Sequence, residues 1–306
     1  HRLSGTIEYY NKYSVDLLAA INGSPTQGFG YTTLMTNNGK MVNRGVEITL
    51  SGEIIRQKDF SWNASLLYAF NRNKVKHISV QPSLWDSRIS MPTSYPMVGK
   101  PLYGIYAYKW AGLNENGDPQ VYDAENNVTS GPARDYHALV YCGTTVPIHN
   151  ASLTNVLRYK GFEFSAMLIL DAGHKLRSSN IPSINMSNGR ITSTAKGIVD
   201  RWTQPGDVTD VPRLLFSNDT ENFNTHRTEL YRYSDLFVYD ASNIRLSNIS
   251  LAYRVPAHWC KKISLSGARL QFNVENVATF AFDSKANYDL GGKVKPNYVW
   301  GLYLNF

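Results

Sequence analysis

The chain ends in ten residues that alternate between large apolar side chains and small or polar ones, NYVWGLYLNF. Side chains two positions apart share one face of a β-strand. One face of this segment therefore carries Tyr298, Trp300, Leu302, Leu304 and Phe306. Such a face invites aggregation in water, so a second sheet or a lipid bilayer has to cover it.

The same period of two recurs along the chain. It is regular in five further segments, near residues 3–17, 46–54, 60–71, 162–170 and 268–275. Segments 149–159 and 243–254 alternate less regularly, and the second changes phase near Ser247 and Asn248, as a β-bulge would make it do. Counted with the last ten residues, these patterns predict eight β-strands.

The connections between these strands alternate in length. The short ones lie near residues 56–58, 160–161 and 256–262, and the long ones cover about 22–40, 75–148, 173–236 and 279–295. Short turns at one end of a sheet and long loops at the other are typical of outer-membrane β-barrels. A soluble sandwich also has short alternating strands, but it has no reason to sort its connections in this way.

The composition agrees with a barrel in lipid. Aromatic residues make up 12% of the chain and charged residues only 18%, yet the mean hydropathy is −0.32. A polar lumen and polar loops dilute the apolar outer face of a barrel, which gives this combination. The net charge is +7, but Lys and Arg are scattered rather than clustered, so the sequence does not indicate nucleic-acid binding. The longest apolar run, AMLIL, is far too short for a membrane helix.

The sequence contains no recognisable catalytic or metal-binding pattern. The seven histidines lack metal-ligand spacing, no serine lies in a G-x-S-x-G setting, and Cys142 and Cys260 form no C-x-x-C pair. Segment 113–123, LNENGDPQVYD, resembles a calcium loop only loosely, because its glycine is misplaced, and is interpreted as a turn. We therefore expect no enzyme activity, no metal and no cofactor.

Several longer segments follow one another in an order typical of one family. They are YYNKYSVDLL (9–18), NRGVEITLSG (43–52), DFSWNASLLYAFNRNKV (59–75), GKPLYGIYAYKWAGLNENGDPQVYD (99–123), LRYKGFEFSAML (157–168), DRWTQPGDVTDVPRL (200–214), YDASNIRLSNISLAYRVP (239–256) and the LYLNF end. This succession resembles the C-terminal part of the SusC/RagA family of TonB-dependent outer-membrane transporters of Bacteroidota.

The resemblance implies an all-β fold in the bacterial outer membrane. Residues 1–306 would form the last eight strands of a transmembrane antiparallel β-barrel of about 22 strands, with the four long loops extracellular and Phe306 at the periplasmic end. It implies import of oligosaccharides or oligopeptides under a SusD-like surface lipoprotein that acts as a lid. The plug domain, which would contact TonB, and the N-terminal part of the barrel are not in this chain.

Two groups of residues are predicted to meet these partners. Leu302 and Leu304 would lie in the hydrocarbon region, with Tyr298, Trp300 and Phe306 toward its edges. Aromatic rings stack on sugars and pack against peptides, so the candidates for substrate or lid contact are Trp85, Tyr95, Tyr103, Tyr106, Tyr108, Trp110, Arg201 and Trp202. The same rings could instead pack the loops together.

Two alternatives remain open from the residues alone. Eight strands can close a small outer-membrane barrel, which would act as an adhesin or anchor. A soluble β-rich binding domain is the other. In a barrel, Cys142 would lie in an outer loop and Cys260 at a periplasmic turn, too far apart for a disulfide.

Overall fold

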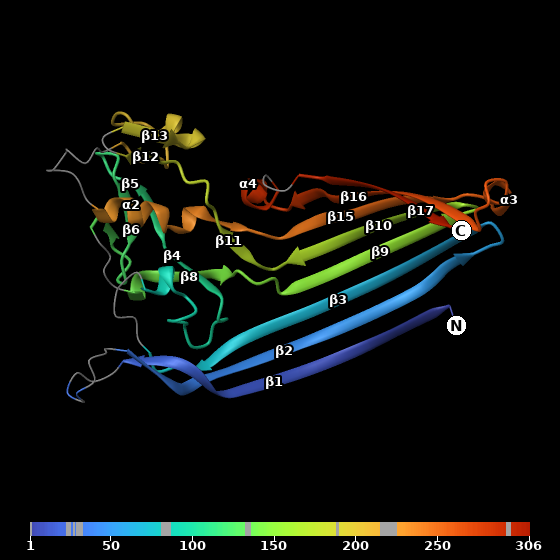
Figure 1. Ribbon diagram of the computed structural model, residues 1–306. Coiled ribbons are helices and arrows are strands. Elements are labelled where there is room, and N and C mark those ends of the chain that lie inside the picture. Colours follow the sequence, from blue (N-terminus) through green and yellow to red (C-terminus); the bar gives the residue numbers. More distant parts are fainter. Residues whose placement is uncertain are drawn as a thin grey trace.

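Eight antiparallel strands form one continuous sheet (Figure 1). The computed structural model describes residues 2–22, 26, 28, 33–80, 87–131, 136–187, 190–214, 225–291 and 295–306. Along the sheet the strands are β1 (Leu3–Asn22), β2 (Thr33–Arg56), β3 (Phe60–His77), β9 (His149–Tyr159), β10 (Phe162–Ala172), β15 (Asn243–Arg254), β16 (Gly267–Ala281) and β17 (Asn297–Asn305). The predicted all-β antiparallel fold is confirmed, and its strands lie side by side in chain order.

The first hairpin is longer than the sequence predicted. Strand β2 begins at Thr33, so the connection from β1 covers 23–32 rather than 22–40. The polar segment TNNGK within β2 looks like a loop in isolation. It is a strand because the end of β1 pairs with it, with Ala20 opposite Met35 and Leu17 opposite Gly39. The other long connections cover 78–148, 173–242 and 282–296.

The long loops contain secondary structure of their own at one end of the sheet (Figure 1). Between β3 and β9 lie α1 (Ser87–Ser90), β4 (Gly104–Tyr108), β5 (Trp110–Leu113), β6 (Pro119–Tyr122), β7 (Val128–Thr129), η2 (Tyr136–Ala138) and β8 (Leu139–Thr144). Between β10 and β15 lie β11 (Lys175–Arg177), β12 (Ile184–Ser187), β13 (Arg190–Thr194), η3 (Lys196–Asp200), α2 (Thr225–Arg232), η4 (Asp235–Phe237) and β14 (Val238–Asp240).

The remaining helices are short. Helix α3 (Ala257–Lys261) lies in the connection from β15 to β16, and η5 (Ser284–Ala286) and α4 (Asn287–Leu290) lie between β16 and β17. Across the described part of the chain, no helix has the length and apolar character needed to cross a membrane.

The register aligns apolar side chains in rows across the sheet. Residues directly opposite one another in antiparallel strands point to the same face. One row crosses seven strands through Ile7, Ile48, Tyr68, Ala151, Leu170, Ile244 and Phe280. The adjacent row, on the opposite face, runs through Thr6, Thr49, Leu67, Ser152, Ile169, Arg245 and Thr279. We call the first face the outer face and the second the inner face.

The bulge predicted in β15 is confirmed. Leu246 and Asn248 both have partners in β10 and β16, and Ser247 between them has none. The extra residue restores the outer orientation of Ile249 and Leu251 after the change of phase. The bulge therefore keeps the apolar row continuous across the sheet.

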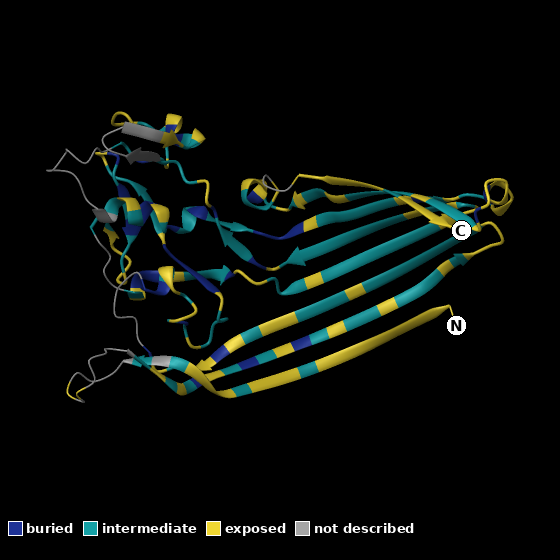
Figure 2. Ribbon diagram, in the orientation of Figure 1, coloured by how far each residue is buried: buried dark blue, intermediate teal, exposed yellow. Residues whose placement is uncertain are grey.

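The apolar outer rows are not covered by protein in the described part of the chain. Ile7 is 74% exposed and Trp300 78%, although both lie within paired strands. Figure 2 shows that fully buried residues gather mainly in the loop region rather than along the sheet. A soluble sandwich would bury these rows between two layers, so the structure contradicts that alternative.

The sheet is open rather than closed. Among the described residues, β1 pairs with β2 alone and β17 with β16 alone, so each strand has one free edge. A complete eight-stranded barrel would need these edges to pair with each other, and this alternative is therefore wrong. Unpaired backbone groups are very unfavourable in lipid, so further strands are needed to complete the wall.

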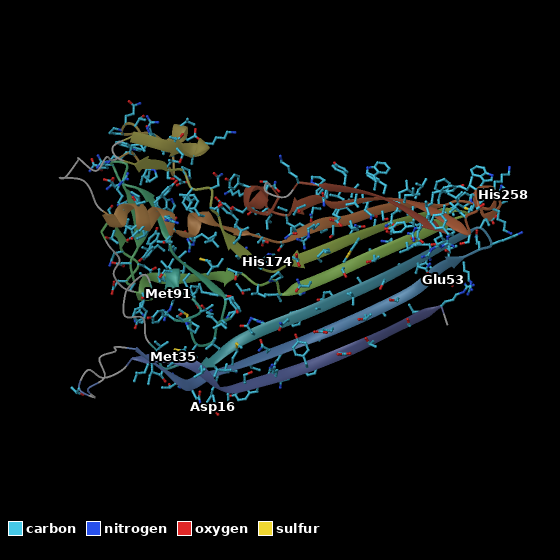
Figure 3. All side chains as sticks on the ribbon, in the orientation of Figure 1. Asp16, Met35, Glu53, Met91, His174 and His258 are labelled. Carbon is cyan, nitrogen blue, oxygen red and sulfur yellow. The ribbon has the colours of Figure 1, made fainter. Side chains whose placement is uncertain are left out.

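The two ends of the sheet differ in character. Both chain termini and the short turns lie at one end, which we call the turn end, and the long loops lie at the other, the loop end (Figure 1). Figure 3 places Glu53 and His258 at the turn end and Asp16 and Met35 at the loop end. Cys142 in β8 and Cys260 in α3 belong to the loop end and the turn end, and both thiols are free.

The outer face should not tolerate a charge. Leu302 lies on the outer face of β17 and is 62% exposed, so Leu302→Arg should destabilise the barrel by about 2–4 kcal/mol if the residue lies near the middle of the bilayer. Val299→Arg, on the inner face of the same strand, is the matched control and should have little effect. The folded fraction of the complete protein in outer membranes is measured by its heat-dependent gel mobility. Equal folded fractions for the two variants would show that lipid does not cover this face.

Candidate functional site

Strands β4 and β8 form the centre of a hydrophobic core at the loop end. They pair antiparallel, and every residue of β4 is buried. The buried members of this core are Tyr106, Tyr108, Val121, Ala138, Leu139 and Leu230. Leu230 comes from helix α2 and the others come from residues 78–148, so this core joins the two largest loops.

Two of the predicted contact residues lie inside this core. Tyr106 is 1% exposed and Tyr108 is fully buried. The hydroxyl of Tyr106 accepts a hydrogen bond from the backbone N–H of Met97 (3.3 Å), and its ring lies 5.8 Å from the ring of Tyr141, centroid to centroid. Burial raises the pKa of Tyr106. These two rings support the loop from within and have almost no surface left for a ligand.

Trp110 links the two large loops. Its indole N–H donates to the carboxylate of Asp210 (2.9 Å), and its backbone N–H donates to the carboxylate of Asp235 (2.9 Å). Its ring lies 5.7 Å from the ring of Tyr231 in α2. The partners are more than 90 positions away in sequence, so this role could not be read from the local pattern.

Trp202 packs on the turn formed by residues 114–118. Gly117 has a φ of +75°, and a Cβ atom there would lie 2.4 Å from the Trp202 ring, so glycine is required both for the turn and for the contact. The side-chain oxygen of Asn114 accepts hydrogen bonds from the backbone N–H groups of Asn116 and Asp118, both at 2.9 Å. This segment, which resembles a calcium loop, is thus folded as an Asx turn.

An ion-pair network fastens the same turn to the second loop. The Asp118 carboxylate binds the guanidinium groups of Arg213 (Nη2–Oδ2 2.9 Å) and Arg227. Arg227 also donates to the backbone carbonyls of Gly117 and Arg213. The three charged side chains are only 12–23% exposed. We call Asp118, Arg213 and Arg227 the loop clamp.

No local sequence pattern predicts the loop clamp. Its only sequence indication is that Asp118 and Arg213 lie in two segments that carry the family resemblance, 99–123 and 200–214. Burial opposes ionisation of Asp118, but the hydrogen bonds from Arg213 and Arg227 outweigh it and hold the pKa of this carboxyl below its usual value. The carboxylate therefore stays charged at neutral pH.

The other predicted contact residues lie at the margins of this assembly. Tyr103 is 47% exposed. Tyr95 is half-buried, and its carbonyl accepts a hydrogen bond from Arg88 (3.4 Å). Arg201 donates to the carbonyl of Ile198 (3.4 Å) at the end of η3. Trp85 lies outside the described residues.

The inner face of the sheet has a hollow of about 260 Å³ that is lined by both polar and apolar side chains. The inner-face residues that line it are Glu47, Thr49, Leu67, Ala69, Asn150, Ser152, Ile169 and Asp171. Asp171 accepts a hydrogen bond from Asn150 (2.7 Å) and pairs with Arg245 (3.7 Å). The inner face at this depth can therefore hydrogen-bond a hydrated, polar molecule.

The described residues contain no cluster that could hold a metal ion through His, Cys, Asp or Glu. The thiol of Cys142 is partly covered, and burial raises its pKa to about 11, so it stays protonated at neutral pH. A protonated thiol is a poor nucleophile. What the loop end offers a ligand is shape, aromatic surface and hydrogen bonds.

The chain is similar to outer-membrane receptors of Bacteroidota. The TonB-dependent receptor P3 of Formosa agariphila is 25% identical, in an alignment that covers 99% of this chain and 31% of the receptor. The TonB-dependent receptor SusC of Bacteroides thetaiotaomicron is 23% identical over 90% of this chain and 26% of the receptor. No protein-family model matches the chain.

Solved structures show the same fold. The structure of the RagAB peptide transporter superposes on the whole of this chain with a TM-score of 0.73 and 22% sequence identity. The open-open state of the RagAB peptide importer gives a TM-score of 0.74 and 21% identity. The chain spans about a third of the length of these proteins and of the receptor P3. The resemblance to SusC/RagA-type transporters is thereby confirmed, and these relatives are named as receptors and transporters.

Removing the loop clamp's carboxylate should release the second loop. Asp118→Asn removes the carboxylate that the two largely buried guanidinium groups share, and losing one partner of a buried ion pair should destabilise the docking of residues 200–214 by about 3 kcal/mol. Limited proteolysis of the complete protein measures this docking as the rate of cleavage within 200–214. Asp207→Asn is the control, because this exposed carboxylate only caps its own turn at Thr203 and Gln204. Unchanged cleavage of D118N would show that the clamp does not hold the loop.

The loop clamp also predicts a pH dependence. The pKa of Asp118 is lower in the folded loop than its unfolded value of about 3.9. Its contribution to stability is therefore complete above that unfolded pKa and is lost as the pH falls through the folded pKa. Protection of residues 200–214 from an acid-tolerant protease should be constant from pH 8 to 5 and should fall below about pH 4. D118N should lack this acid transition, and an identical transition in D118N would assign it to another group.

Proposed function

Because this chain is a section of an outer-membrane β-barrel of the SusC/RagA type, we propose that the complete protein imports nutrients across the outer membrane with energy from TonB. The observation that carries the proposal is the alignment of nearly the whole chain with proteins named as TonB-dependent receptors. The chain supplies part of the wall and the large loops. The plug domain, the contact with TonB and the remaining strands belong to the rest of the protein.

The cargo enters at the loop end, which faces the outside of the cell, and leaves at the turn end, which faces the periplasm. Supporting this direction, the long loops gather at one end of the sheet (Figure 1), and Tyr103, Trp110 and Trp202 belong to these loops. The polar inner face, with the hollow beside Asn150 and Asp171, gives a hydrated path along the wall. The apolar outer face keeps the wall in lipid.

The cargo we propose is an oligosaccharide. Tyr103 presents an exposed ring at the loop end, and aromatic rings stack on the apolar faces of sugars. An oligopeptide is the second candidate, because the RagAB proteins that share this fold are described as a peptide transporter and importer. Both cargoes use the same aromatic surface and the same polar path.

A SusD-like surface lipoprotein is the proposed lid. The loop clamp and the hydrophobic core hold the two largest loops as one platform on which a lid can rest. Near Arg201 and Trp202, Val199 is 73% exposed and Val208 fully exposed, although both are apolar. Exposed apolar side chains beside an arginine and a tryptophan are typical of a protein-protein contact.

Uptake by intact cells tests this function. Cells that express the complete protein and its lipoprotein partner should accumulate labelled oligosaccharides, and deletion of the gene should abolish uptake. Dissipating the inner-membrane proton gradient should stop accumulation but leave surface binding intact. Preferential uptake of labelled oligopeptides would show that the cargo is an oligopeptide rather than an oligosaccharide. If deletion of the gene reduces the uptake of neither oligosaccharides nor oligopeptides, the proposal is overturned.

Tyr103→Ala should weaken cargo binding about two- to thirteenfold, since an aromatic contact contributes about 0.5–1.5 kcal/mol. Val128→Ala is the control, because Val128 is similarly exposed (49%) in the same loop but has no ring. Equilibrium binding of the labelled cargo to the purified complex gives the comparison. Equal affinities of Y103A and V128A would remove Tyr103 from the cargo site.

A further inference from the structure

A group of cationic side chains lies on the inner face at the turn end. Arg158, Lys160, Arg254 and Arg269 line one hollow together with Glu163, and we call these five residues the basic mouth. Register places the three arginines and Glu163 on the inner face. Arg158 lies opposite Ser61, and Glu163 lies opposite Ala252, both inner-face residues. Arg254 is two residues from Ala252, and Arg269 is two residues from Gln271, which is also on that face. The three arginines and Glu163 therefore face the interior of the barrel rather than the lipid, and Lys160 lies in the turn beside them.

The single carboxylate does not neutralise this group. Glu163 pairs with Arg158 (Nε–Oε2 2.7 Å) and with Arg269 (Nη2–Oε1 3.0 Å), which uses both of its oxygens. Among the described residues, the side chain of Arg254 makes no hydrogen bond or ion pair, and that of Lys160 only lies over the ring of Tyr159 (5.3 Å). An excess of positive charge remains at the mouth.

The register makes this excess unfavourable in the isolated sheet. Arg254 lies directly opposite Arg269, and like charges directly opposite one another on the same face destabilise a strand pair. Between these side chains is a hollow of about 120 Å³, lined also by Ala252 and Gly161. The small residues keep the hollow open, so a group from another segment has room to approach the guanidinium groups.

We infer that the basic mouth binds the carboxylates of an acidic polypeptide segment that is resident in the barrel interior. This inference rests on the proposed function, in which a plug domain fills the barrel. Guanidinium groups bind carboxylates with paired, charge-assisted hydrogen bonds, which suits Asp and Glu side chains. Lipid phosphates are excluded, because the apolar rows that meet lipid are on the opposite face. A resident segment offsets the Arg254–Arg269 repulsion continuously, which a passing cargo does not.

Carbodiimide coupling of the complete protein tests the inference. The reagent joins a lysine amine directly to a carboxylate that touches it, and arginine does not react. Arg254→Lys keeps the positive charge and introduces the reactive amine. R254K should give a new cross-link from position 254 to an Asp or Glu outside residues 1–306 of this chain, identified by mass spectrometry of the digested protein. Wild-type protein should lack this link.

Arg245→Lys is the matched control. Arg245 is also on the inner face and partly exposed, but it pairs with Asp171 of its own chain (3.7 Å), so R245K should link to Asp171. The internal link shows that the barrel is folded and that the reagent reaches the interior.

Three outcomes would overturn the inference, given that R245K links to Asp171. They are a link of R254K to Glu163 alone, a link to cargo or to the lipoprotein, and no link at all. Uptake by the same R254K cells keeps this result separate from the proposed function. Normal uptake without the cross-link removes only the acidic partner, whereas absence of uptake in wild-type cells removes the import function itself.

Discussion

Backbone hydrogen bonding between neighbouring strands is the constraint on which the rest of this structure depends. In lipid every N–H and C=O needs a partner, so strands can cross only as members of a continuous ladder. The ladder sets the register, and the register carries apolar side chains such as Ile7, Ile48 and Ile244 into one row. Even the irregular strand β15 obeys this requirement, because the bulge at Ser247 absorbs one residue and returns Ile249 to the outer face. The free edges of β1 and β17 mark where the same requirement is met by other strands.

Beyond the sheet the physical problem changes, and the chain builds a conventional core. The loop end buries aromatic side chains, with Tyr106 and Tyr108 at its centre, and closes it with the loop clamp centred on Asp118. Loss of one partner from such a largely buried ion-pair network strongly destabilises the folded state. The clamp and the core make a stable platform of two loops that are far apart in sequence. Residues at the rim of that platform, such as Tyr103 and Trp202, are those that we propose for contact with cargo or lid.

The inner face combines hydration with charge. The hollow beside Asp171 includes polar side chains that are internally paired, Asp171 with Asn150 and Arg245. At the turn end the balance differs, since Arg254 and Arg269 oppose each other with one shared carboxylate nearby. Repulsion built into a strand pair implies a partner that relieves it. The outer face, the loop end and the basic mouth thus have three distinct chemistries, which are apolar side chains, buried aromatic and ion-paired side chains, and excess positive charge.

The period of two along the chain determined the eight strands, the face that meets lipid and the bulge in β15, because alternation in a strand is a local property of neighbouring residues. The family resemblance of the longer segments also indicated the outer membrane from the sequence alone. Tertiary structure alone decided that β2 begins at Thr33, that Tyr106 is buried and that Asp118 binds Arg213 and Arg227. These features depend on partners from 11 to 109 residues away. No periodicity records such distant contacts, because they arise only when the sheet brings the loops to the same end.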